Sequence, residues 1–399
     1  MSAEELTADE VARLAEVDRA FVDRAVAAGA LGPAGGRSFT RDDAARLRVL
    51  RMWDAAGLPV ASIAAAVARG DLSFGFLDNP TMAVGDQLDV AYDVWCSRQG
   101  IDLATIQAIH ESLGFTPPEG TDPARSDDIP LVGLFRAMTS AGAGDSAVWR
   151  LLRVYADGLR RIAEAEREFY EAEVEGPLRR EGHSDLDLLD RGAAVGRDLM
   201  EAIEATLLSI YRRHRSHVWL DHSVGHVEVI LEAEGLYRRS ATPPSVCFVD
   251  LAGYTRITDE LGDSAAADLA GRLAALVSGI SQRHEGRPVR WLGDGGMFVF
   301  RHPAAAVAAA TEIVVASPEE GLPPTHIGIH TGPLVFQDGD IYGGTVNIAA
   351  RLSARAEAGE ILVSAPVAAG VPEVAFEPIG PVSLKGVAHP IDVFRVKGS

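Results

Sequence analysis

The sequence is poor in cysteine, in positive charge and in long apolar runs. Only two of its 399 residues are cysteine, Cys96 and Cys247, which is too few for a disulfide framework and suits a reducing compartment. The 57 acidic residues outnumber the 37 basic ones, and the formal charge of -20 excludes a protein that coats nucleic acid or anionic lipid through bulk charge. Because no run approaches about 18 apolar residues, we predict no integral membrane segment.

What is present is the composition of a folded protein. Hydrophobic residues make up 47% of the chain, enough for two separate cores at this length. The first residues, MSAEELTADEVARL, are acidic and lack the basic and apolar regions of a secretory signal. We therefore expect a cytoplasmic protein.

The character of the sequence changes near residue 240, where the segment RRSATPPS contains two prolines that end a helix. Before residue 241 there are 40 acidic and 26 basic residues, so most of the negative charge belongs to the first part. We predict an all-helical domain over residues 1–215, a linker helix and joint over 216–242, and a second domain over 243–399.

Helical periodicity dominates the first part, whereas short β-branched runs and glycine turns dominate the second. In the first part we predict helices over 40–53, 59–69, 84–112, 145–174 and 193–214, and a loop after Gly176. In the second part we predict strands over 245–250, 288–292, 297–301, 325–330, 333–336, 360–364, 374–378 and 391–397, with helices over 254–284, 303–316 and 344–356. This order predicts an α+β sandwich with helices on one face of a sheet.

Two aspartates stand where a metal ion is commonly held. Asp250 ends the apolar run SVCFVD, and the turn that follows opens a helix whose first N–H groups, at Gly253, Tyr254 and Thr255, attract phosphate. Asp294 lies in a Gly-Asp-Gly-Gly turn between two strand-like runs. Each alone reads as a cap or turn former. Together with a triphosphate, the pair makes a suitable Mg²⁺ site.

Five motifs then occur in order: FVDLAGYT, WLGDGG, GIHTGP, DIYGGTVNIAARL and SLKGV. In this order they resemble class III nucleotidyl cyclases, and the resemblance covers residues 245–397. It implies a ferredoxin-like α/β sandwich that converts ATP to 3′,5′-cyclic AMP and pyrophosphate.

The resemblance assigns roles residue by residue. Asp250 and Asp294 match the aspartates that hold two Mg²⁺ or Mn²⁺ ions per active site. Asn347 and Arg351, four residues apart on one helix face, match the pair that orients the ribose and neutralises the α-phosphate. Lys385 matches a lysine that binds the triphosphate.

Two further positions concern the base. Asp340 matches the residue that accepts a hydrogen bond from the adenine amino group, which favours ATP over GTP. Arg290 stands where the family usually has an adenine-reading lysine, and this exchange is not conservative at a shaped site. The segment LVFQDG between GIHTGP and DIYG is short, as in the class IIIc subgroup that this chain resembles. Pro333 stands where some relatives have an additional arginine, so the contact of that arginine is not available here.

In this family the aspartates and the Asn/Arg pair of one active site come from opposite subunits. The resemblance therefore implies a homodimer with shared active sites.

A helical domain before a class IIIc catalytic domain also resembles the pH-responsive arrangement of actinobacterial cyclases. Four of the eleven histidines fall within 13 residues: His214, His217, His222 and His226. They could take part in regulation by changing charge near neutral pH, or they could be ordinary solvated side chains of a helix. A small hydrophobic ligand inside the helical domain is another possible signal.

Two other functions remain open. Arg290 permits a catalytically weak or silent nucleotide-binding signalling protein. Residues 38–72 resemble the helix-turn-helix of MerR-type regulators, which permits a DNA-binding regulator with a cyclase-type sensor domain. The acidic first part argues against binding to DNA, so we expect no nucleic-acid partner and read this segment as a packed helical hairpin with Leu47, Leu50, Trp53 and Ile63 in its core.

Overall fold

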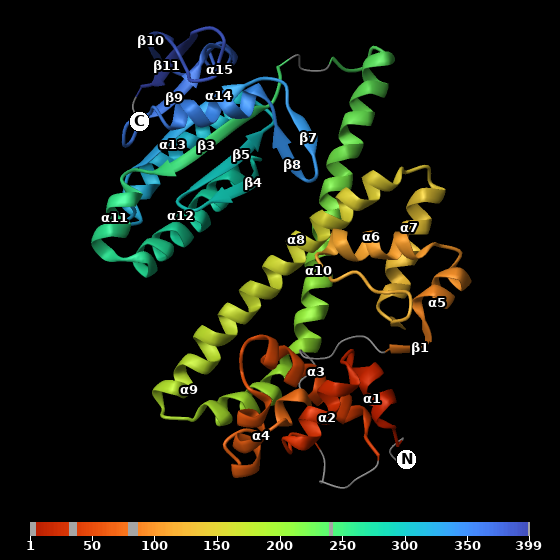
Figure 1. Cartoon of the computed structure of the whole chain (residues 1–399). Coiled ribbons are helices and arrows are strands. Elements are labelled where there is room, and N and C mark those ends of the chain that lie inside the picture. The colour runs from red at the N-terminus through yellow and green to blue at the C-terminus, as the bar shows by residue number, and fades with distance from the viewer. Residues whose placement is uncertain (1–4, 32–37, 79–86, 239–241, 398–399) are drawn as a thin grey trace. The chain divides into compact units, whose positions relative to one another are not determined.

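The computed structural model describes residues 5–31, 38–78, 87–238 and 242–397, without the side chains of 190–198, 200 and 292. The chain divides into two compact units, Met1–His222 and Ser223–Ser399 (Figure 1). The division falls inside the long helix α10 (Asp185–Ala233), so residues 216–233 continue the preceding helix. The three domain boundaries given above stay a prediction, and residues 239–241 of the expected joint lie outside the described residues.

The first part of the N-terminal unit is a small group of helices around one apolar cluster. Thr40 and Asp43 form a capping box at the start of α3, where the sequence predicts a helix to begin. Leu47 and Leu50 are fully buried, and Trp53 stacks on Phe74, so this segment packs as a helical hairpin. The elements are α1 (Ala8–Ala15), α2 (Arg19–Ala27), α3 (Arg41–Ala55), α4 (Val60–Arg69) and the 3₁₀ turn η1 (Gly75–Asp78).

The second part of this unit differs from the predicted elements in several places. The helix Asp128–Ser140 was not predicted, nor were the two short strands Gln87–Ala91 and Pro123–Arg125, which pair with each other. The single helix expected over 84–112 is wrong for its described residues: Gly100, at φ +64, ends one helix before another begins. The loop expected after Gly176 is also wrong: most of residues 177–192 are helical, in a short helix that ends at Arg180 and in the long helix that begins at Asp185. The elements are β1 (Gln87–Ala91), α5 (Tyr92–Gln99), α6 (Leu103–Leu113), β2 (Pro123–Arg125), α7 (Asp128–Ser140), α8 (Asp145–Tyr170), the π-helical turn η3 (Glu171–Glu175) and α9 (Gly176–Arg180). Among the described residues, none of the helices has both the length and the apolarity needed to cross a bilayer.

A seven-stranded sheet forms the centre of the C-terminal unit, in the order β10-β11-β9-β6-β3-β5-β4 (Figure 1). Only β6 and β9 pair in parallel; the other neighbours in this sheet are antiparallel. The strands are β3 (Ser245–Leu251), β4 (Arg287–Leu292), β5 (Gly295–Phe300), β6 (Thr325–Thr331), β9 (Ile361–Ser364), β10 (Phe376–Val382) and β11 (Ile391–Val396). A separate hairpin contains β7 (Val335–Gln337) and β8 (Asp340–Tyr342).

Helices cover both faces of this sheet, whereas the sequence predicted helices on one face. Cys247 and Val249 of β3 pack with α12 and α13, and the alternate residues Val246 and Phe248 pack with α14. A Cβ at Gly328 of β6 would lie 2.1 Å from the backbone nitrogen of Ser353, so glycine is what lets α14 lie so close. The helices are α11 (Tyr254–Leu261), α12 (Asp263–Arg283), α13 (Pro303–Glu319), α14 (Gly344–Ser353) and α15 (Ala365–Gly370).

Candidate active site

Two aspartates lie side by side at the ends of neighbouring central strands. Asp250 is the penultimate residue of β3, and in the sheet register it lies opposite Gly295 of β5 and His326 of β6. Asp294 lies in the turn between β4 and β5, and its backbone carbonyl accepts a hydrogen bond of 3.2 Å from the N–H of Leu251. The sheet register therefore brings together the two carboxylates that the sequence singled out.

The surroundings of Asp250 favour a cation. Burial and the negative charge of Asp294 raise the pKa of Asp250 to about 6, although His326 opposes this shift. A Cβ at Gly295 would lie 2.8 Å from Oδ1 of Asp250, so the glycine keeps open the space that the carboxylate occupies. Two carboxylates that repel each other are stabilised by a divalent ion between them, so the residues fit the two Mg²⁺ or Mn²⁺ ions that the family implies.

The aspartate pair leaves most coordination positions of a metal ion to other ligands. Within the four described ranges, no three His, Cys, Asp or Glu side chains are arranged to hold a metal ion. Magnesium usually takes one or two carboxylates and completes its shell with water and substrate phosphate oxygens. The arrangement therefore suits an ion that arrives with a nucleotide better than a permanent structural ion.

The start of α11 lies directly after Asp250. Gly253 precedes the helix at φ +74, a left-handed conformation that favours glycine, and the first helical hydrogen bond joins the N–H of Ile257 to the carbonyl of Gly253. Tyr254 packs against the core, so its backbone N–H rather than its ring is available to a ligand. The first N–H groups of a helix have no partner inside it and attract anions, which keeps Gly253, Tyr254 and Thr255 as candidate phosphate-binding residues.

A pocket of about 270 Å³ opens on the face of the sheet that packs against α14. Arg290 of β4 forms an ion pair with Asp340 of β8, and Oδ1 of Asp340 also accepts a hydrogen bond of 2.8 Å from the N–H of Ile341. Asn347, at the start of α14, contributes to the same wall. The other lining residues are mostly apolar: Phe248, Met297, Ile341, Tyr342, Gly343 and Val346. The pocket is thus lined by two of the residues that the sequence assigned to substrate, Arg290 and Asn347, and the ion pair with Arg290 holds a third, Asp340, beside it.

Farther along α14, Arg351 extends toward the turn that contains Lys385. A Cβ at Gly386 would lie 3.3 Å from a terminal nitrogen of Arg351, so this guanidinium lies beside the residue that follows Lys385. Lys385 itself is exposed, and Arg351 is half-buried. Two cations from distant parts of the sequence therefore lie near each other at one edge of the unit.

His326 is a residue near this site that sequence reasoning missed. Its Nδ1 lies 2.9 Å from the carbonyl of Ser353, at the end of α14, and its Nε2 lies 3.9 Å from Oδ2 of Asp250. A carbonyl can only accept, so Nδ1 carries the proton of this bond. Nothing in the linear sequence signals the contact, because it depends on the register between β3 and β6.

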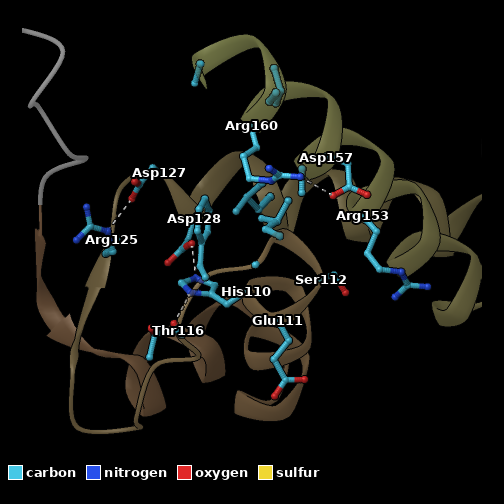
Figure 2. Close-up of a pocket in the computed structure, with 17 residues that line it drawn as sticks. His110, Glu111, Ser112, Thr116, Arg125, Asp127, Asp128, Arg153, Asp157 and Arg160 are labelled. Atoms are coloured by element: carbon cyan, nitrogen blue, oxygen red, sulfur yellow. Dashed lines mark hydrogen bonds and ion pairs between the residues drawn. The ribbon is translucent and has the colours of Figure 1, made fainter. Parts of the chain in front are cut away.

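The N-terminal unit contains a larger cavity, of about 1030 Å³, between α6, α7 and α8 (Figure 2). His110 and Asp128 are buried at its wall, where Nε2 of His110 lies 2.8 Å from Oδ1 of Asp128. Nδ1 of His110 faces the carbonyl of Thr116 at 3.2 Å, and the hydroxyl of Tyr92 donates to Asp128. Burial alone would lower the pKa of His110, but the hydrogen bond and charge of Asp128 outweigh it, so this pKa is raised. Sequence reasoning did not identify this network.

The clustered histidines that sequence reasoning did identify lie elsewhere. All four are exposed on α10: His214, His217, His222 and His226. His217 lies 3.7 Å from Asp221, one turn away, and His222 makes an edge-to-face contact with Trp219. Their role in regulation stays a prediction.

Comparison with known proteins identifies the second unit. Residues 236–398 match the adenylate and guanylate cyclase catalytic domain family. The C-terminal unit is therefore a class III cyclase catalytic domain that follows a helical N-terminal region, and both the family resemblance and the fold class predicted from the sequence are confirmed.

Similarity to individual proteins extends further along the chain. A pH-sensitive adenylate cyclase of Mycobacterium tuberculosis is 27% identical over 318 residues, 75% of either chain. An adenylate cyclase of Glutamicibacter nicotianae is 27% identical over 294 residues, 71% of this chain and 72% of the relative. An uncharacterised M. tuberculosis protein is 25% identical over 355 residues, 88% of this chain and 90% of the relative. Each alignment is longer than the C-terminal unit, so each includes part of the helical region.

Proposed function

We propose that this protein is an adenylate cyclase that converts ATP to 3′,5′-cyclic AMP and pyrophosphate. The observation that carries the proposal is the arrangement on one face of the sheet. Asp250 and Phe248 alternate with the core residues of β3, so each chain presents both halves of a cyclase site on one side of the sheet, the paired aspartates and the pocket lined by Arg290 and Asn347. Two relatives named adenylate cyclases, similar over most of the chain, support the choice of ATP.

Each residue has a distinct task in this reaction. Asp250 and Asp294 would hold two Mg²⁺ or Mn²⁺ ions, which would supply activation of the ribose 3′-hydroxyl and charge neutralisation for the triphosphate. Arg351 neutralises the charge that develops on the α-phosphate, and Asn347 orients the ribose. Lys385 binds the outer phosphates.

Two further groups complete substrate binding. Asp340 accepts a hydrogen bond from the adenine amino group, beside Arg290. The backbone N–H groups at the start of α11, at Gly253, Tyr254 and Thr255, stabilise phosphate oxygens next to the aspartates. Together they hold the base at one end of the nucleotide and the phosphates at the other.

We propose that the enzyme is a homodimer whose active sites are shared between subunits. Exposed apolar residues on α10 support a partner: Val218, Trp219 and Leu220 are 55%, 66% and 64% exposed in the single chain. Three consecutive helix positions cover about 200° of the circumference, and a helix that is apolar on so many sides is normally buried. A second copy would cover these side chains and supply the complementary half of each site.

We propose that the helical N-terminal region modulates the activity in response to pH or to a small hydrophobic ligand. The pH-sensitive relative aligns over most of both chains, which supports a pH response. The exposed histidines of α10 and the buried His110–Asp128 pair are candidate groups for such a response. The cavity in Figure 2 is also lined by Leu113, Phe115, Leu131 and Leu159, which supports the alternative of a ligand with an apolar part.

The direct test is to incubate the purified full chain with ATP or GTP and Mn²⁺ between pH 5 and 8 and to detect the cyclic nucleotide. Cyclic AMP is expected from ATP. The absence of any cyclic product across this range would rule out the proposed activity.

A mixing experiment tests the shared active site. Asp250→Ala and Asn347→Ala chains should each be inactive alone, because each lacks one half of every site. An equal mixture should regain about a quarter of the activity, since half of the random dimers are mixed and each has one intact site. If the mixture stays inactive while exchange of subunits is demonstrated, the shared-site dimer is wrong.

A further inference from the structure

His326 lies beside the aspartate pair, and the proposed reaction gives it no task. It is directly opposite Asp250 in the register of β6 with β3, and its side chain is 16% exposed. One ring contacts both the end of α14 and Asp250. From these contacts we infer that His326 is a positioning residue of the metal site, which supports the ion at Asp250 from outside its shell of ligands. The inference rests on the proposed function, because it concerns the metal site of the same reaction.

The first ring nitrogen of His326 is bound to the helix. Nδ1 donates to the carbonyl of Ser353 at 2.9 Å, and this carbonyl also accepts the N–H of Ala356 at 3.0 Å, so both of its lone pairs are used. Gly328, two residues along β6 on the same face, has no side chain and lets the last turn of α14 come close enough for this bond. The bond therefore fixes the tautomer and the direction of the ring.

The second ring nitrogen faces the aspartate without binding it. Nε2 lies 3.9 Å from Oδ2 of Asp250, which is longer than a hydrogen bond. With the proton on Nδ1, Nε2 of the neutral ring is an acceptor, and the oxygens of an ionised carboxylate are acceptors too. Two acceptors that face each other repel unless a positive charge or a donor lies between them. The gap between His326 and Asp250 is therefore suited to the surroundings of a cation.

A position outside the ligand shell agrees with the chemistry of the expected ions. Among the side chains that the structure describes, His326 does not join the two aspartates as a third ligand. Magnesium keeps several waters when it is bound by one or two carboxylates, and such waters are donors that need acceptors. A histidine that ligates a metal usually has its other ring nitrogen bound to a carbonyl or a carboxylate, and such outer partners tune the affinity of the site. His326 has the same arrangement one layer farther from the ion.

The test measures binding of Mn²⁺ to the full chain by electron paramagnetic resonance, with an ATP analogue that lacks the 3′-hydroxyl. His326→Asn keeps a donor near the position of Nδ1 and removes the acceptor that faces Asp250. It should raise the dissociation constant of Mn²⁺ by about 10- to 100-fold, the usual cost of losing an outer partner, with little change in the melting temperature. His326→Gln places a polar group near the position of Nε2 and should restore most of the affinity. Asp250→Ala should abolish binding, which assigns the measured ion to this site.

His330→Asn is the matched control. His330 lies on the same strand and face, and its Nδ1 is likewise bonded, 2.6 Å from Oγ of Ser364, but it lies opposite Val246 instead of Asp250. The substitution should leave the affinity for Mn²⁺ unchanged.

The outcomes separate the inference from the proposed function. If His326→Asn binds Mn²⁺ as tightly as the wild type, or if His330→Asn weakens binding equally, the inference is wrong and the adenylate cyclase remains in place. A wild type that binds no Mn²⁺ overturns the inference together with the metal site. If the wild type binds Mn²⁺ but forms no cyclic nucleotide, the proposed function fails, and the dissociation constants of the variants still decide the role of His326.

Discussion

In the N-terminal unit, Asp128 is 3% exposed and is bound by both Tyr92 and His110, whereas in the C-terminal unit Asp250 faces Asp294. The first carboxylate is compensated by its neighbours, whereas the second faces a like charge that His326, 3.9 Å away, offsets only in part. A compensated buried charge contributes to a defined fold, while an uncompensated pair is tolerated where a ligand will satisfy it. The difference agrees with the proposal that the C-terminal unit binds a cation at this pair, whereas the N-terminal unit uses its buried charge as part of its own structure.

The largest effect is expected at Asp250 and Asp294, where neutral substitutions should abolish most activity without lowering stability. Asp250→Asn and Asp294→Asn should each lower kcat/KM by about a thousandfold, because a bound metal ion contributes several kcal/mol to transition-state stabilisation. The same substitutions should leave the melting temperature unchanged or higher, since they remove like-charge repulsion. Steady-state assays and thermal unfolding measure the two effects.

Asp392→Asn is the matched control, because Asp392 is exposed on β11. It should change neither quantity. If either active-site variant kept more than a tenth of the wild-type activity, Asp250 and Asp294 would not be the metal-binding pair.

The next largest effect is expected where α14 meets the sheet. In Gly328→Ala the new methyl group would lie 2.1 Å from the nitrogen of Ser353 and 2.4 Å from the carbonyl of Ala349, both backbone atoms. We expect a destabilisation of about 1–3 kcal/mol, as for other overpacked sites, and loss of most activity, because α14 holds Asn347 and Arg351. Urea unfolding and activity assays test this.

Gly271→Ala provides the control for that substitution. Gly271 lies in α12 and a Cβ there meets nothing within 4 Å, so alanine should stabilise the chain by about 0.5–1 kcal/mol. Equal effects of the two substitutions on stability would contradict the close packing at Gly328.

The sequence predicted the C-terminal unit better than the N-terminal one, for physical reasons. Its strands are bounded by glycine turns, and Asp250 and Asp294 lie beside such turns, so both the elements and the aspartates could be found locally. The run SVCFVDL, however, is apolar on both faces, and its pattern could not show that α14 covers the second face. The N-terminal helix expected over 84–112 failed because one glycine, Gly100, outweighed the helical periodicity around it.

The contacts of the site were less predictable than its members. Arg290 and Asp340 are both recognisable, but their pairing joins positions fifty residues apart and depends on the β7–β8 hairpin. His326 is close to Asp250 only through strand register, and His110 meets Asp128 only through helix packing. Such contacts arise from tertiary structure and leave no local pattern.

Removing the contact between His110 and Asp128 should have a moderate effect, on the free energy of unfolding rather than on catalysis. His110→Asn keeps a donor near the position of Nδ1 but removes the contact with Asp128, and should cost about 2 kcal/mol. Because the folded-state pKa of His110 is raised, its contribution is complete below its ordinary value of 6.5 and is lost as the pH rises through the higher value. The wild-type melting temperature should therefore fall over this range, and that of His110→Asn should fall less.

Glu111→Gln is the control for this comparison, since Glu111 is the exposed neighbour of His110 on α6 and takes no part in the hydrogen bonds of His110 with Asp128 and Thr116. It should keep the wild-type dependence on pH. Parallel curves for the wild type and His110→Asn would show that the pair does not titrate in this range.

The smallest effect is expected at the histidines of α10. His217 is 73% exposed, so solvent screens its charge and its pairing with Asp221 contributes little in a single chain. Any influence depends on a second copy that covers the apolar sides of this helix, where each added charge would cost about 0.5–1 kcal/mol and change activity about two- to fivefold. Replacing all four, His214, His217, His222 and His226, by glutamine should flatten the pH profile of cyclase activity in the full chain. If that profile is unchanged but is flattened in His110→Asn, the buried pair of the N-terminal unit, and not the exposed helix, is the pH-responsive element.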